Sequence, residues 1–106
     1  MVHIMATMWW PPTKNRDVAK KVIEGRKKFP PDESLFTTLA QGMMGDKMGV
    51  KAITIANVKD GKLVEALTLA REMLRFYEEI EGLTSKIDLM TTPEEGFAAL
   101  GMKRPE

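Results

Sequence analysis

Four short stretches of the chain are rich in large apolar residues but show no helical period, and this pattern is typical of β-strands. The first stretch stops at Pro11-Pro12, because proline cannot continue a ladder of backbone hydrogen bonds. The third contains many β-branched residues, which favour extended backbone. We therefore predict strands over these ranges: 2–10, 35–41, 50–58 and 84–90.

Two longer stretches repeat their apolar residues every three or four positions, which predicts amphipathic helices over about 14–28 and 62–80. Thr13 or Asn15 would cap the first helix at its start. Its expected buried stripe is made of these residues: Val18, Ala19, Val22, Ile23 and Phe29. Gly82 follows the second helix at a position where glycine commonly ends one.

Two further signals concern the connections and the end of the chain. The range 42–49 is rich in glycine, and we expect it to form a flexible connection between the second and third strands. Thr92-Pro93-Glu94-Glu95 matches a capping box with proline at the first helical position. This box predicts a short third helix that runs to Leu100 and is stopped by Gly101.

The resulting order is β-α-β-β-α-β followed by a terminal helix. Two helices that connect antiparallel strands in this order predict a four-stranded sheet with both main helices on one face, which is an α+β, ferredoxin-like fold. A length of 106 residues gives room for one core. We therefore assign 1–106 to a single ferredoxin-like domain.

Successive strand residues point to opposite faces of a sheet, so the strands provide two sets of side chains. The first set is bulky and apolar, and we assign it to the helices: Val2, Ile4, Ala6, Met8, Leu35, Leu39, Ile53, Ile55, Ile87 and Leu89. The second set is mixed: His3, Met5, Thr7, Trp9, Phe36, Thr38, Ala40, Ala52, Thr54, Ala56, Lys86, Asp88 and Met90. Left in water, the apolar members of the second set would form a large patch, so we expect a second copy of the sheet to cover it. The sequence therefore predicts a homodimer.

Composition narrows the classes of function. The chain has no cysteine, which excludes disulfides, thiolate chemistry and cysteine-ligated metals. Its single histidine excludes a metal site built on two histidines of one chain, and we expect no metal and no cofactor. A net charge of +1 gives no general attraction to nucleic acid or to an anionic membrane. The apolar first ten residues are too short for a membrane span and lack the features of a signal peptide, so we expect a soluble, cytoplasmic protein.

The charge is nevertheless uneven along the chain. The range 13–28 carries seven cations and two acids, whereas 62–81 carries three cations and five acids. Two solvated helix faces on one side of the sheet account for this pattern, and so does a basic patch that binds a partner.

Candidate chemistry is confined to a few residues. His3 and Asp88 share the second face and could form an acid–base pair, although a hydrogen-bonded structural histidine is the simpler interpretation of His3. Lys86 shares that face with Asp88 and could pair with it across a dimer or bind a polar ligand group. Candidate ligand-binding residues near a cavity are Trp9, Trp10, Phe36, Thr38 and Lys86.

The element order, the aromatic end of the first strand (Trp9-Trp10-Pro11-Pro12) and the small, mixed second face resemble the dimeric α+β barrel superfamily. Trp10-Pro11-Pro12 and Ile80-Glu81-Gly82 are also similar to segments of its small uncharacterised members. The resemblance implies two ferredoxin-like sheets packed face to face. That superfamily includes cofactor-independent monooxygenases, small isomerases, haem-dependent enzymes and ligand-sensing domains, so the fold alone does not choose a function.

Three other groups with this topology do not fit the residues. RNA-recognition domains need stacking aromatic residues on the third strand, and 50–58 has none. Metal-carrying ferredoxin-like domains need a Cys-x-x-Cys motif. Acylphosphatases need an anion-binding loop with arginine directly after the first strand, where this chain has Pro11-Pro12-Thr13-Lys14.

Three functions stay open. The first is a homodimer that binds a small apolar or aromatic molecule in a pocket between helices and sheet or between two sheets. The second is a cofactor-independent enzyme, monooxygenase- or isomerase-like, that uses His3 and Asp88 as acid and base and is shaped by Trp9 and Phe36. The third is a structural dimer module that presents its basic helix to a protein partner.

Overall fold

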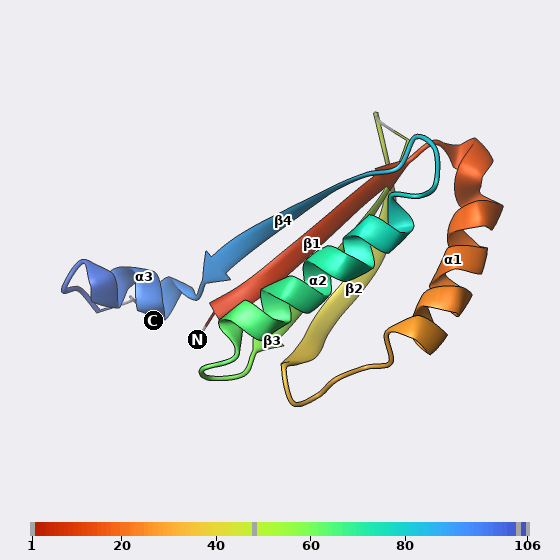
Figure 1. Cartoon of the computed structure of the whole chain (residues 1–106). Helices are drawn as coiled ribbons and strands as arrows, with labels where there is room; N and C mark the ends of the chain where they lie inside the picture. The colour runs from red at the N-terminus through yellow and green to blue at the C-terminus, as the bar shows by residue number, and fades with distance from the viewer. Residues whose placement is uncertain (1, 48, 104, 106) are drawn as a thin grey trace.

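The computed structural model of the chain describes residues 2–47, 49–103 and 105. These residues form one sheet, two main helices and a short terminal helix that stands apart from the rest (Figure 1). The strands are β1 (Val2–Trp10), β2 (Phe36–Asp46), β3 (Gly49–Val58) and β4 (Thr84–Thr91). The helices are α1 (Asn15–Lys28), α2 (Leu63–Tyr77) and α3 (Pro93–Ala99), and a single 3₁₀ turn, η1 (Pro12–Lys14), precedes α1.

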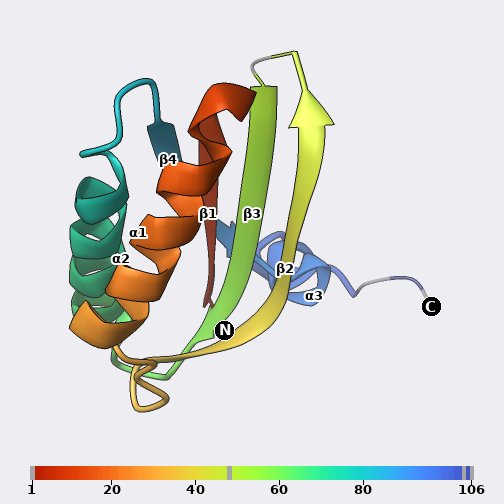
Figure 2. The ribbon, with the colours of Figure 1, turned by 90° about the vertical axis from the view of Figure 1, so that its right-hand side faces the viewer.

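The strands form one antiparallel sheet in the order β2-β3-β1-β4. Figure 2 shows α1 and α2 together on one face of this sheet, while the opposite face carries neither. We call these the helix face and the open face. The arrangement confirms the predicted α+β, ferredoxin-like fold.

Two local predictions were wrong. The range 42–49 is not a loose connection, because β2 runs on to Asp46 and pairs with β3 until the two strands turn; Met48 lies outside the described residues. Neither Thr13 nor Asn15 caps α1. The N-cap is Lys14, without a side-chain hydrogen bond, and the Asn15 side chain instead accepts a hydrogen bond from the Trp10 indole at 2.7 Å.

The end of the chain forms as expected. Thr92 Oγ1 accepts a hydrogen bond from the backbone of Glu95 at 3.2 Å, and the Glu95 carboxylate accepts one from the backbone of Thr92 at 3.3 Å. This reciprocal pair is the predicted capping box. Gly101 has a positive φ of 71°, which is consistent with a helix stop at this position.

The face assignment was correct for β1 and β4 and wrong for β3. Directly paired residues in a sheet share a face, and Ile4 pairs with Ala56 on one side and Leu89 on the other. The helix face of β3 is therefore formed by Val50, Ala52, Thr54, Ala56 and Val58. Ile53 and Ile55, which pair with Thr7 and Met5, lie on the open face.

In β2 the two faces exchange at an irregularity. Phe36 and Thr38 pair with Val58 and Ala56 and so belong to the helix face, not to the open face as predicted. A register shift between Thr38 and Ala40 then places Ala40 opposite Ile55, on the open face where we expected it. Leu39, expected beneath the helices, is 55% exposed.

The core is divided into two clusters on the helix face. One contains Trp10, Val18, Ile80 and Leu83, and the other contains Ile4, Val58 and Ala66. The expected stripe of α1 is only partly buried, since Ile23 is 63% exposed. The two clusters lie at opposite ends of the sheet. The middle of the layer between helices and sheet therefore contains neither cluster.

Candidate functional site

A cavity of about 460 Å³, partly open to solvent, lies between the two core clusters and is bounded by the helix face of the sheet and by α1 and α2. Its floor consists of Ile4, Ala6 and Met8 of β1 and of Ala52, Thr54 and Ala56 of β3. Its roof comes from Val22 and Gly25 of α1 and from Leu69, Ala70, Met73, Leu74 and Tyr77 of α2. A cavity of this size is typical of sites for small molecules.

The cavity exists because the residues in the middle of the helix face are small. Ala6 pairs directly with Thr54. Ala52 and Ala56 are the next residues of β3 on the same face, two positions before and after Thr54. These short side chains fill little of the space between the sheet and the helices. Bulky residues, by contrast, fill both ends of the face, where Trp10 and Val58 are almost fully buried.

The two helices meet at one end of the cavity through a glycine. A Cβ atom at Gly25 would lie 3.0 Å from the hydroxyl oxygen of Tyr77, so a side chain here would require Tyr77 to shift. Phe29 packs edge-on against Phe76, with ring centroids 5.9 Å apart. The contact holds the helix layer together beside the cavity.

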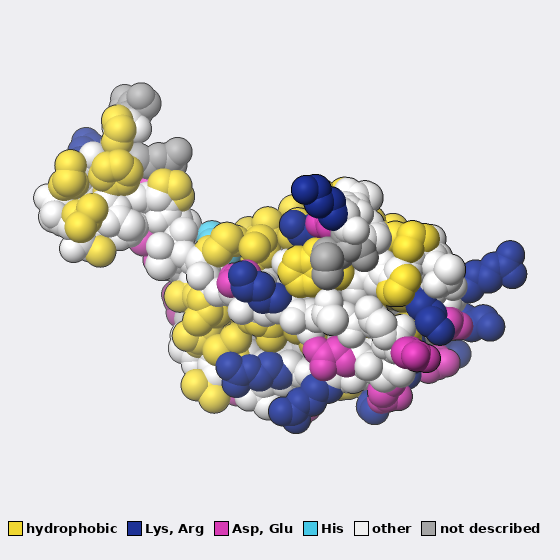
Figure 3. Space-filling model, turned by 90° about the horizontal axis from the view of Figure 1, so that it is seen from above, with side chains coloured by type: hydrophobic (Ala, Val, Ile, Leu, Met, Phe, Trp, Pro, Cys, Tyr) yellow, Lys and Arg dark blue, Asp and Glu magenta, His cyan; other side chains and the backbone are white. Residues whose placement is uncertain are grey.

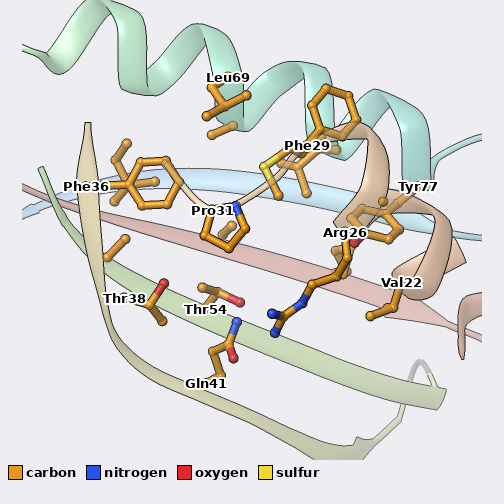
Figure 4. A pocket seen from close by; sticks show the side chains of 18 of the residues that line it. Val22, Arg26, Phe29, Pro31, Phe36, Thr38, Gln41, Thr54, Leu69 and Tyr77 are labelled. Atoms are coloured by element: carbon orange, nitrogen blue, oxygen red, sulfur yellow. The ribbon is translucent and has the colours of Figure 1, made fainter. Parts of the chain in front are cut away.

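The polar groups of the cavity gather on the side of β2 and α1. Figure 4 shows the Arg26 side chain reaching from α1 into the cavity, with Thr38, Gln41 and Thr54 around the same region. Burial raises the pKa of Tyr77, and the positive charge of Arg26 partly offsets this rise. The Tyr77 phenol therefore stays protonated at neutral pH and can donate a hydrogen bond.

Two of the predicted ligand-binding residues line this cavity, namely Phe36 and Thr38. Trp10 lies on the same face but is packed into a core cluster and is only 3% exposed. Trp9 lies on the open face, where the Lys51 ammonium stands 5.8 Å from the centre of an indole ring.

The predicted acid–base residues lie on the open face as well. His3 pairs with Met90, and Met5 pairs with Asp88, so His3 and Asp88 are diagonal neighbours. The Asp88 carboxylate forms its ion pair with Lys86, at 3.4 Å on the same strand. The sheet therefore separates all three residues from the cavity, and none of the cavity-lining residues is histidine, aspartate or glutamate.

Three residues of the cavity were not predicted from the sequence: Arg26, Gln41 and Tyr77. A signal for Arg26 was present, because it follows Val22 by four positions and precedes Phe29 by three, and therefore shares their side of α1. Gln41 could not be placed, since the register shift in β2 decides its face.

No cluster of three or more metal-ligating side chains is found among the described residues. Within the same residues, no helix combines the length and apolar character needed to cross a membrane.

Comparison with known proteins supports the fold. No protein-family model matches this sequence, and no curated protein matches it either. Among solved structures, an antibiotic biosynthesis monooxygenase is similar with a TM-score of 0.56 and 18% identity, over 87% of this chain and 98% of the other. A conserved protein from Methanosarcina mazei Go1 gives a TM-score of 0.55 with 10% identity, over 86% and 91%.

A de novo designed protein, Foldit4, is also similar, with a TM-score of 0.52 and 13% identity over 86% of this chain and 96% of the other. Identities this low show a shared fold only. At that level they confirm the predicted resemblance, because the chain has the ferredoxin-like fold of the antibiotic biosynthesis monooxygenase.

Proposed function

We propose that this protein binds a small, largely apolar molecule in the cavity between its helices and its sheet. The observation that carries the proposal is the cavity itself, about 460 Å³ with walls that are mostly Ala, Met, Leu, Val and Phe. It interrupts the core in the place where a domain of this size would otherwise pack its centre.

A ligand in this space would stabilise the fold. Apolar surface removed from water contributes roughly 25 cal/mol per Å². A molecule that binds only the folded state adds its binding free energy to the stability of that state. Small residues such as Ala52 and Ala70 leave apolar surface in the cavity that no other side chain covers. A bound ligand would cover this surface.

Native mass spectrometry of the purified protein, together with titration by an environment-sensitive apolar dye, tests this proposal. Ala70→Phe would fill the cavity from α2 and should abolish dye binding while the protein stays folded. Ala19→Phe makes the same change at an exposed position of α1 outside the cavity and should leave binding intact. Equal dye binding by both variants, or no binding of any apolar dye by the wild type, would refute the proposal.

The likeness to an antibiotic biosynthesis monooxygenase makes a cofactor-independent enzyme the second candidate. Catalysis in this cavity would need a group that accepts a proton, and His3 and Asp88 lie on the opposite face of the sheet. Tyr77 is a protonated phenol there and is suited to hold a ligand oxygen. This separation favours ligand binding over turnover, and His3→Ala should leave the affinity of the cavity unchanged.

The homodimer belongs to the same proposal, with a second copy of the chain as the occupant of the open face. Met5, Trp9, Ile53, Ile55 and Met90 point to this face, which α1 and α2 do not cover. The face also carries charges of both signs, Lys86 and Asp88, which form an ion pair within the chain at 3.4 Å.

The short helix α3 supports a second copy independently. It stands apart from the body beyond the end of β4, and Figure 3 shows hydrophobic side chains on this lobe. Leu100 is 74% exposed. Since α3 projects away from its own sheet (Figure 1), a neighbouring copy is the surface on which its apolar residues can pack.

A further inference from the structure

Arg26 differs from the other cations of α1 in what surrounds it. The Lys21 ammonium donates to the Glu79 carboxylate at 2.9 Å, and the Lys28 ammonium lies 5.1 Å from the centre of the Phe76 ring. Arg26 lies at the solvent-exposed mouth of the cavity, its side chain extends over apolar residues (Figure 4), and it has no carboxylate partner within residues 2–47, 49–103 and 105. A guanidinium without a counter-ion in such surroundings is poised to bind an anion.

Hydrogen-bonding groups accompany the guanidinium. Gln41 and Thr54 are directly paired across β2 and β3, and both line the cavity on the helix face. Thr38 belongs to the same face, opposite Ala56. Amide and hydroxyl donors beside a planar, forked cation suit an acceptor with two oxygens, such as a carboxylate.

We propose that the ligand of this cavity is an apolar monocarboxylate whose carboxylate is bound by Arg26 with help from Gln41 and Thr54. The inference rests on the proposed function, since it names the class of ligand for the same site. Arg26 is the one cation among the residues that line the cavity, which matches a single negative charge better than a phosphate. The rest of the ligand lies against the small residues of the floor.

Two fluorescent probes of the same size test this inference, pyrenebutyrate and pyrenebutanol, because they differ in charge and share an apolar body. The wild type should bind pyrenebutyrate roughly ten- to hundredfold more tightly, as a charge-assisted hydrogen bond allows. Arg26→Gln should remove this preference and keep the affinity for pyrenebutanol. Lys27→Gln removes the same charge from an exposed neighbour that does not line the cavity, so the preference should persist.

The outcomes separate the inference from its premise. Equal binding of the two probes by the wild type, or a preference that survives in Arg26→Gln, would overturn the role of Arg26 and leave the ligand-binding cavity standing. Tighter binding of a matched pyrene phosphonate than of pyrenebutyrate would overturn the assignment to a monocarboxylate. Failure of the wild type to bind either probe would overturn both proposals. Urea unfolding of each variant establishes that the compared proteins are folded.

Discussion

Trp10 joins the end of β1 to the start of α1 through one hydrogen bond. Its indole is almost completely buried, and its N–H donates to Oδ1 of Asn15 at 2.7 Å. The indole N–H has little access to water, so burying it would cost free energy if Asn15 did not accept its hydrogen bond. Asn15 therefore stabilises the first helix through a tertiary contact and not through the cap for which the sequence suggested it.

Asn15→Ala should destabilise the protein by about 1–2 kcal/mol, because the buried Trp10 donor loses its acceptor and this loss outweighs the better helix propensity of alanine. Asn15→Asp keeps an acceptor at the same place and should stay close to the wild type. Urea unfolding followed by tryptophan fluorescence measures both. An equal loss in the two variants would show that the indole hydrogen bond is not the cause.

The residues of the candidate site were predicted in part. Phe36 and Thr38 line the cavity, but they were predicted on the opposite face of the sheet, because bulk was taken as the mark of the helix side. In this protein the centre of the helix side is made of Ala and Thr, since a cavity needs small residues, and Ile53 and Ile55 lie on the open face. A shift by one residue moves the side chains of a strand to the opposite face of the sheet. The sequence alone does not determine this register when the residues for both faces are apolar.

At the scale of elements, the order of strands and helices followed from periodicity and from Pro and Gly at the turns. The capping box placed α3 within one residue of its observed end. The failure was β2, whose glycines suggested a loop. Pairing with β3 holds this strand in place to Asp46, and such tertiary pairing commonly overrides intrinsic propensity.

Two glycines of the β2–β3 hairpin should respond differently to the same change. Gly49 has a φ of 117°, and a Cβ there would lie 2.4 Å from the backbone oxygen of Trp10. Gly49→Ala should therefore cost about 1–3 kcal/mol or more from backbone strain and collision. Gly45→Ala meets no atom within 4 Å and should change stability by less than about 0.5 kcal/mol. Thermal unfolding compares them, and similar melting temperatures for the two variants would contradict this account.

The ion pair between α1 and the segment after α2 should make stability depend on pH. The hydrogen bond from Lys21 and its positive charge lower the pKa of Glu79. A carboxyl whose folded pKa is depressed stabilises the fold above its unfolded pKa, and this contribution is lost as pH falls through the folded pKa. Glu79→Gln should therefore be less stable than the wild type near pH 7 and equal to it near pH 3.

Urea midpoints at these two pH values check the ion-pair prediction. Glu81→Gln is the matched control, since Glu81 is an exposed acid two residues further on with no ion pair within the described part of the chain. The difference in urea midpoint between Glu81→Gln and the wild type should not change with pH in the way expected for Glu79→Gln. A constant difference between Glu79→Gln and the wild type from pH 7 to pH 3 would exclude the ion pair as the source.

The whole molecule is less compact than its length predicts. The radius of gyration is 15.6 Å, whereas a compact chain of this length has about 13 Å. The difference fits the projection of α3 away from the body (Figure 1). Two apolar surfaces are therefore left in water: the open face of the sheet and the helix α3, which follows β4. A single partner molecule can cover both surfaces.

Ile55→Glu should convert the proposed homodimer to single chains, because it places a charge at the centre of the open face, opposite Met5. Light scattering at micromolar concentration should give twice 11.9 kDa for the wild type and 11.9 kDa for the variant. Val64→Glu makes the same change at a site on α2 that is 74% exposed, and it should leave the mass at the dimer value.

Removal of α3 and dye binding to the dissociated protein give two further tests of the proposed dimer. If a second copy covers both surfaces, then removal of the chain after Thr91 should weaken the dimer, while Ile55→Glu should not unfold α3, whose capping box is local. The ligand cavity lies on the other face of the sheet, so dye binding should survive dissociation. A wild type that weighs 11.9 kDa over the whole concentration range would mean that the open face of the sheet is stable in water by itself.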